Sequence, residues 1–153
     1  MKTIILYDSQ YGNTKKIAQS LADTDKSIKL FSVDQIKLSD LKNIDLLVVG
    51  SPTQAGQATV NLLNFFKTIP SNYLSGIKVA AFDTRMNEST LSFFLKILVK
   101  IIGYASPKIL KKLVSLGGQP LGESGFLVQS QKGPLCDDEF ELALDWFKKI
   151  LKS

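Results

Sequence analysis

The chain has 153 residues, enough for one ordinary domain, and 44% of them are hydrophobic, so it can bury a core without disulfides or a metal. It contains no histidine and only one cysteine, Cys136, which excludes Ser-His-Asp and Cys-His nucleophilic sites and the usual zinc cages. One cysteine cannot form an intrachain disulfide, and the apolar N-terminal run stops at Asp8. We therefore expect a single domain over residues 1–153, located in the cytoplasm.

The net charge of +5 is concentrated in one part of the chain. No acidic residue lies between Glu88 and Glu123, whereas five lysines do, and the rest of the chain has 14 basic and 14 acidic residues. Because the excess is local, it does not indicate a nucleic-acid-binding protein.

Strands and helices are expected to alternate along the chain. An apolar, β-branched run predicts a first strand at 2–7, and apolar residues at helical spacing predict a first helix at 14–22. The further strands are expected at 27–33, 44–50, 77–82 and 125–129. The further helices are expected at 59–68, 90–102, 107–116 and 137–151.

This alternation predicts an α/β fold, a three-layer sandwich around a five-stranded parallel sheet with strand order 2-1-3-4-5. In such a fold the ligand site lies beyond the carboxyl ends of the strands, at the switch point between strands 1 and 3. Three loops are expected to meet there, at 8–14, 50–59 and 83–87. The candidate binding residues therefore lie in these loops.

The first loop, Ser9-Gln10-Tyr11-Gly12-Asn13-Thr14, precedes the first helix. Its hydroxyls, its glycine and the free amides of the first helical turn suit a phosphate dianion, and no lysine is required. The same residues also suit helix capping and a tight turn. Composition alone favours neither interpretation.

The order of these residues is more specific. Ser-x-Tyr-Gly-Asn-Thr directly after the first strand resembles the phosphate loop of the flavodoxin family, usually Thr/Ser-x-Thr/Tyr-Gly-Asn-Thr. The order of strands and helices is also that of the family, so the resemblance covers nearly the whole chain. It implies a flavodoxin-like fold with FMN as cofactor, whose phosphate would be held by Ser9, Gln10, Tyr11, Gly12, Asn13 and Thr14. The Gly-x-Gly-x-x-Gly spacing of dinucleotide-binding folds is absent.

The second loop extends the resemblance, because Ser51-Pro52-Thr53 is similar to the family's Ser/Thr-Pro-Thr loop. By that resemblance, Ser51, Pro52 and Thr53 would line the ribityl chain and the ring edge of FMN. Gln54, Ala55 and Gly56 would approach the isoalloxazine ring. The alternative is a rigid turn before the next helix.

The third loop contributes Asp83, Thr84 and Arg85, in a string similar to flavodoxin-domain proteins other than the acidic electron carriers. Neither the second nor the third loop has the aromatic residues with which the carriers sandwich the flavin, which predicts weaker binding or a more open ring. The Arg85 guanidinium beside the ring would favour reduced flavin and raise its potential. The alternative is that Arg85 pairs with Asp83 or Glu88.

The segment at 90–102 is apolar at nine of its thirteen positions, with Ser92, Lys96 and Lys100 recurring every fourth residue. A helix on a sheet needs only one apolar face, so we expect a second face to be covered by the helix at 107–116 or by self-association. Contact with an anionic membrane surface is the alternative that the local charge favours. A protein or an apolar substrate is the third interpretation of this segment. Residues 89–116 are therefore the expected contact segment, in a homo-oligomer, at the periphery of a membrane or with such a partner.

The sequence thus predicts an FMN-binding flavodoxin-like protein that carries out electron transfer or flavin-dependent reduction. Its partner would be a redox protein or a small-molecule electron acceptor, and no catalytic acid or base is indicated. One alternative is a membrane-associated flavodoxin-like oxidoreductase of the protoporphyrinogen oxidase type, because those enzymes also carry an extra segment late in the domain. Another is a flavodoxin-fold interaction module that has lost FMN.

Overall fold

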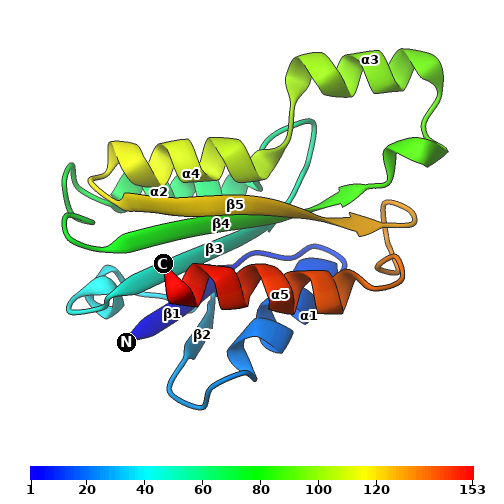
Figure 1. Cartoon of the computed structure of the whole chain (residues 1–153). Helices are drawn as coiled ribbons and strands as arrows, with labels where there is room; N and C mark the ends of the chain where they lie inside the picture. Colours follow the sequence, from blue (N-terminus) through cyan, green and yellow to red (C-terminus); the bar gives the residue numbers. More distant parts are fainter.

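Five parallel strands form the central sheet of the computed structural model, which describes residues 1–153 (Figure 1). The strands are β1 (Thr3–Tyr7), β2 (Lys29–Ser32), β3 (Leu46–Pro52), β4 (Lys78–Met86) and β5 (Gln119–Val128). Their order in the sheet is β2-β1-β3-β4-β5, and every neighbouring pair is parallel. The predicted α/β sandwich and strand order are confirmed.

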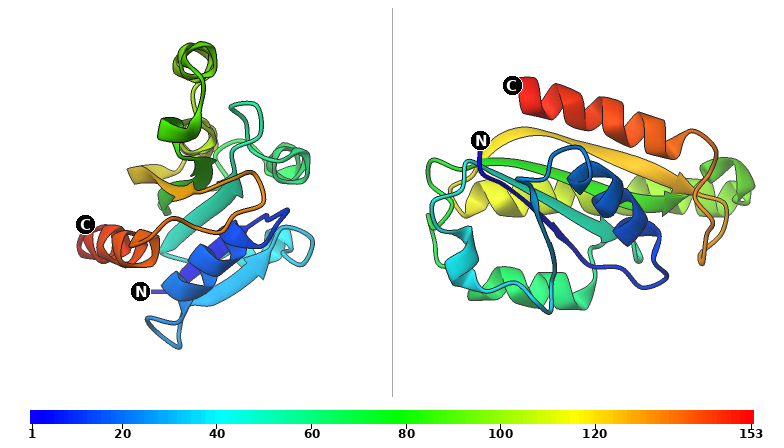
Figure 2. Two further views of the ribbon diagram at one scale, coloured as in Figure 1. Left: turned by 90° about the vertical axis from the view of Figure 1, so that its right-hand side faces the viewer. Right: turned by 90° about the horizontal axis from the view of Figure 1, so that it is seen from below.

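Helices cover both faces of this sheet (Figure 2). The helices on one face are α1 (Asn13–Ala22) and α5 (Glu139–Lys152), and those on the other are α2 (Val60–Thr68) and α4 (Ala105–Ser115). Short 3-10 helices occupy Leu38–Leu41 and Glu88–Thr90. These bounds agree with the expected helices to within a few residues.

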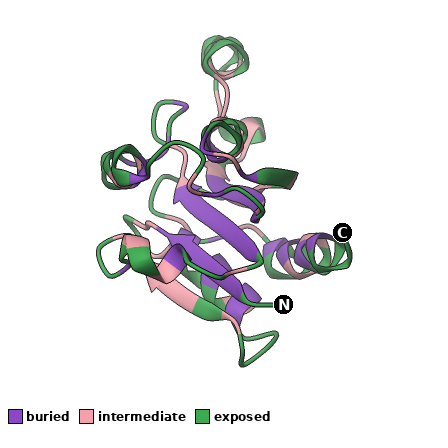
Figure 3. Ribbon diagram, turned by 90° about the vertical axis from the view of Figure 1, so that its left-hand side faces the viewer, coloured by how far each residue is buried: buried purple, intermediate pink, exposed green.

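The core lies on both sides of the sheet because successive strand residues point to opposite faces. In β1, Ile4 and Leu6 belong to a cluster of 18 buried residues under α2 and α4, whereas Ile5 and Tyr7 belong to a cluster of 16 buried residues under α1 and α5. Figure 3 shows the central strands as the most continuously buried part of the molecule. This double burial explains the unbroken apolar run at 46–49.

Two strands are longer than expected. β4 continues through Asp83, Thr84 and Arg85 to Met86, and β5 begins at Gln119. The predicted loop at 83–87 is therefore wrong over most of its length, since Asp83 pairs with both Ser51 of β3 and Gly125 of β5. The polar side chains suggested a loop, but backbone pairing on both sides continues the strand.

The remaining helix, α3 (Phe93–Ile102), stands apart from the sheet (Figures 1 and 2). None of its residues is buried. The expected cover by the helix at 107–116 is wrong, because α4 buries its apolar residues Ile109 and Leu113 against the sheet instead. Gly103 caps the C-terminal end of α3 with a φ of 76°, and the chain turns there before α4 begins. No helix combines the length and the apolar character that crossing a membrane requires.

Candidate functional site

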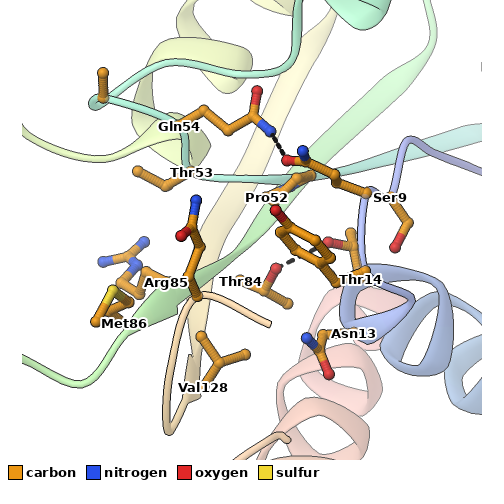
Figure 4. Close-up of a pocket in the computed structure, with 14 residues that line it drawn as sticks. Ser9, Asn13, Thr14, Pro52, Thr53, Gln54, Thr84, Arg85, Met86 and Val128 are labelled. Carbon is orange, nitrogen blue, oxygen red and sulfur yellow. Dashed lines mark hydrogen bonds between the residues drawn. The ribbon is translucent and has the colours of Figure 1, made fainter. Parts of the chain in front are cut away.

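A cavity of about 480 Å³ opens at the carboxyl ends of β1, β3 and β4 (Figure 4). Eleven of the fifteen candidate residues line it: Ser9, Gln10, Tyr11, Asn13, Thr14, Pro52, Thr53, Gln54, Ala55, Thr84 and Arg85. The topology thus brings three segments that are far apart in the sequence to one site, at the switch point of the sheet.

Side-chain hydrogen bonds join these segments across the cavity. Gln54 Nε2 donates to Gln10 Oε1, which links the second segment to the first (Figure 4). The hydroxyl groups of Thr14 and Thr84 form a buried hydrogen bond of 2.8 Å, which links the first segment to the end of β4. The walls of the cavity are therefore held together by the protein's own polar groups.

The loop between β1 and α1 has unpaired backbone N–H groups in residues that line the cavity. Gly12 takes the N-cap position of α1 with a φ of 88°, a conformation that glycine adopts without strain. Ser9 Oγ accepts hydrogen bonds from the N–H groups of Gly12 (3.1 Å) and Lys15 (3.3 Å). The remaining N–H groups of the turn, those of Gln10, Tyr11, Asn13 and Thr14, form no hydrogen bond within the protein. Four free amides at the positive end of a helix dipole are the donor set that an anion requires.

Three residues outside the candidate set also line the cavity: Met86, Val128 and Gln131. Val128 ends β5, beside Met86 of β4. The following loop is tied to the site because Asn13 Nδ2 donates to the carbonyl of Lys132 at 3.1 Å. The sequence held a signal for this wall, since the fifth strand of a parallel sheet must end at the same edge as its neighbours.

Four candidates do not line the cavity: Gly12, Ser51, Gly56 and Asp83. Ser51 is buried, and its Oγ donates to the Pro52 carbonyl and accepts from Thr59 N–H, both at 3.0 Å. These hydrogen bonds brace the turn before α2, while Pro52, Thr53, Gln54 and Ala55 of the same loop line the cavity. Gly56 instead contacts α3, where an added Cβ would lie 2.1 Å from Ile102 Cγ2.

Asp83 is the buried centre of a hydrogen-bond network beside the cavity. Its carboxylate accepts from Arg85 Nε at 2.6 Å and Arg85 Nη2 at 2.9 Å. It also accepts from the N–H of Ser106 at 2.8 Å and the hydroxyl of Thr53 at 3.0 Å. Arg85 is thus paired with Asp83, as the alternative interpretation proposed, and its charge is balanced inside the protein.

The aromatic ring of Tyr104 packs against the Arg85 guanidinium. Arg85 Cζ lies 3.7 Å from the centre of the Tyr104 ring, a cation–π contact. Burial, together with the hydrogen bond and the charge of Glu88, raises the pKa of Tyr104 to about 12. The Tyr104 hydroxyl therefore stays protonated at neutral pH and donates to Glu88. Sequence reasoning missed this contact because Tyr104 lies beyond α3 in the chain.

Comparison with known proteins identifies the family. The flavodoxin domain family matches residues 4–101, which is more than half of the chain and includes the three candidate segments that line the cavity. The chain belongs to the flavodoxin domain family. The predicted family is confirmed, and membership supports FMN as the cofactor and electron transfer as the function at the level of the family. The protoporphyrinogen oxidase type and the FMN-free module are not favoured.

Individual relatives agree with this family. A flavodoxin of Aquifex aeolicus (strain VF5) is 34% identical over 73 residues, which are 44% of this chain and 40% of the relative. The alignment therefore spans less than half the length of that curated relative. The structure of Flavodoxin 1 from Bacillus cereus has a TM-score of 0.75 at 19% identity, covering 99% of this chain and 98% of that one. A flavodoxin from the domain Archaea has a TM-score of 0.70 at 22% identity and covers 99% of both chains. At these identities the two structures establish the fold.

Proposed function

We propose that the protein is a single flavodoxin domain that binds FMN in the cavity of about 480 Å³ and transfers electrons through it. Electrons would pass to a redox partner protein or a small-molecule acceptor. The observation that carries the proposal is the set of four free N–H groups at the N-terminus of α1, at one end of this cavity. FMN supplies the redox chemistry when bound, and the protein supplies binding, orientation and electrostatics.

The proposed orientation follows from where the donors lie. The phosphate would lie against Ser9–Thr14, the sugar chain along Pro52 and Thr53, and the ring toward Ala55 and Arg85. Because Asp83 balances the charge of Arg85, we expect Arg85 to raise the flavin potential less than a lone guanidinium would.

Retention of FMN tests this proposal. Protein mixed with excess FMN and then desalted should keep about one flavin per chain, with a visible absorbance spectrum shifted from that of free FMN. The same mixture desalted in denaturant is the control and should lose the flavin. A native protein that retains no flavin at micromolar concentration would contradict the proposal and favour the FMN-free module.

A specific observation also supports the proposed contact segment at 89–116. The outer face of α3, defined as Phe93, Phe94, Ile97 and Ile101, is solvent-exposed, with exposures of 80% for Phe93 and 76% for Ile101. Lys96 and Lys100 lie beside this face on the same helix, in the part of the chain that lacks acidic residues. We propose that the outer face of α3 binds an anionic membrane surface, because apolar side chains flanked by lysines match such a surface. A second copy would bring like-charged lysines together.

Vesicle sedimentation with two matched variants tests this contact. The protein should sediment with phosphatidylserine-containing vesicles more than with phosphatidylcholine vesicles, and Ile101→Asp should weaken binding about tenfold. Val99→Asp adds the same charge on the opposite side of α3 and should bind nearly as wild type. Equal binding to both vesicle types would contradict the proposal. A dimer in sedimentation analysis that Ile101→Asp dissociates would assign the outer face to a second copy instead.

A further inference from the structure

A second cavity, of about 340 Å³, lies between α3 and the body of the protein. Eight of its twelve lining residues are hydrophobic, and α3 contributes Leu95, Leu98, Val99 and Ile102. It shares Thr53, Ala55, Arg85 and Met86 with the proposed FMN cavity. The two cavities are therefore neighbours, and they adjoin at the end where the proposed orientation puts the flavin ring.

The second apolar side of α3 faces this cavity. Leu95, Val99 and Ile102 follow at intervals of three or four residues and so share one side of the helix. That side is distinct from the outer face of α3, whose residues do not line the cavity. A surface segment with two apolar sides is unfavourable in water unless each side has an occupant.

The polar groups of the cavity restrict its ligand. No carboxylate lines it. The Tyr104 hydroxyl is engaged by Glu88, and Arg85 uses Nε and Nη2 for Asp83 and Ser106, so Nη1 is the guanidinium nitrogen outside these bonds. A ligand here meets apolar walls and one hydrogen-bond donor whose charge is already balanced by Asp83.

We propose that this cavity binds a flat, mainly apolar aromatic carbonyl compound, whose oxygen accepts a hydrogen bond from Arg85 Nη1. A cavity of this volume suits a molecule of about two fused rings. A neutral carbonyl fits better than a carboxylate, because Asp83 already neutralises Arg85. The position of the ligand beside the flavin ring rests on the proposed function, whereas binding to the cavity does not require FMN.

Fluorescence titration with prodan, a neutral naphthyl ketone, tests the proposal. In the full chain without FMN, prodan should bind saturably at one site with a blue-shifted emission. Val99→Asp puts a carboxylate against the apolar ligand and should weaken binding at least about tenfold. Leu95→Trp fills the cavity without adding charge and should weaken it similarly. Ile101→Asp is the matched control on the outer face and should leave binding unchanged.

Each of these results would overturn the proposal: prodan binding that does not saturate, unchanged binding in both Val99→Asp and Leu95→Trp, or loss of binding in Ile101→Asp. Circular dichroism verifies that each variant is folded, which we expect because no residue of α3 is buried.

Repeating the titration with FMN separates the two proposals. Displacement of prodan by FMN would move the probe to the FMN cavity and overturn the inference. Prodan binding in a protein that does not bind FMN would leave it standing while the proposed function fails.

Discussion

Asp83→Ala is expected to lower the free energy of unfolding by about 3–5 kcal/mol, because it removes one partner of a buried ion pair. The Asp83 side chain is fully buried and that of Arg85 is 17% exposed. Without the carboxylate, the Arg85 cation, the N–H of Ser106 and the hydroxyl of Thr53 all lose an acceptor. The loss should appear in urea unfolding followed by circular dichroism.

Asp145→Ala is the matched control for this change. Asp145 pairs with Lys148 at 3.1 Å, but both side chains are 66% exposed, so solvent screens the pair. Its removal should cost less than about 1 kcal/mol. Similar losses in the two variants would show that the network around Asp83 is not the stabilising centre that its burial implies.

The first segment of the cavity lining was predictable from the sequence because it is a short motif with a specific residue order. Ser9–Thr14 follows an apolar strand and precedes a helical pattern, so both its position and its free amides were predictable. The roles of Ser51 and Gly56 were not predictable. Whether such a residue lines a cavity or braces a turn depends on contacts with Thr59 and Ile102, which only the folded chain brings near.

The end of β4 shows a different limit of the sequence. Asp83 and Arg85 are two residues apart, so they share one side of a strand and can pair there. Polar composition suggested a loop, and the local pattern does not reveal that Gly125 of β5 leaves the space that the Arg85 guanidinium occupies. Strand alternation predicts the Asp83–Arg85 ion pair only when β4 is taken to continue to Met86, and the sequence predicted that this strand ends at 82.

The place of α3 could not be derived from its composition. Nine apolar residues in thirteen indicate that more than one side needs cover, but not what provides it. Gly103 lies between the two helices with a φ of 76°, and beyond it α4 packs on the sheet while α3 stays outside.

Ser9→Asp is the second change with a large expected effect, and it should weaken FMN binding about thirtyfold or more. An added carboxylate near the phosphate dianion costs about 2 kcal/mol or more at the dielectric of a protein surface. An aspartate oxygen can still accept from the N–H groups of Gly12 and Lys15, as Ser9 Oγ does, so the turn should persist. Ser9→Asn keeps an acceptor without the charge and should bind FMN within a few-fold of wild type. Equal affinities for Ser9→Asp and Ser9→Asn, measured by quenching of flavin fluorescence, would argue against a phosphate beside Ser9.

The most direct measurement compares the affinities of the protein for FMN and for riboflavin, which differ only in the phosphate. If the free N–H groups of Gln10, Tyr11, Asn13 and Thr14 bind that phosphate, FMN should bind at least about a hundredfold more tightly, since each hydrogen bond to a charged group contributes about 1.5–3 kcal/mol. Titration of the FMN-free protein with each flavin gives the ratio. Equal affinities for FMN and riboflavin would contradict a phosphate site at the N-terminus of α1.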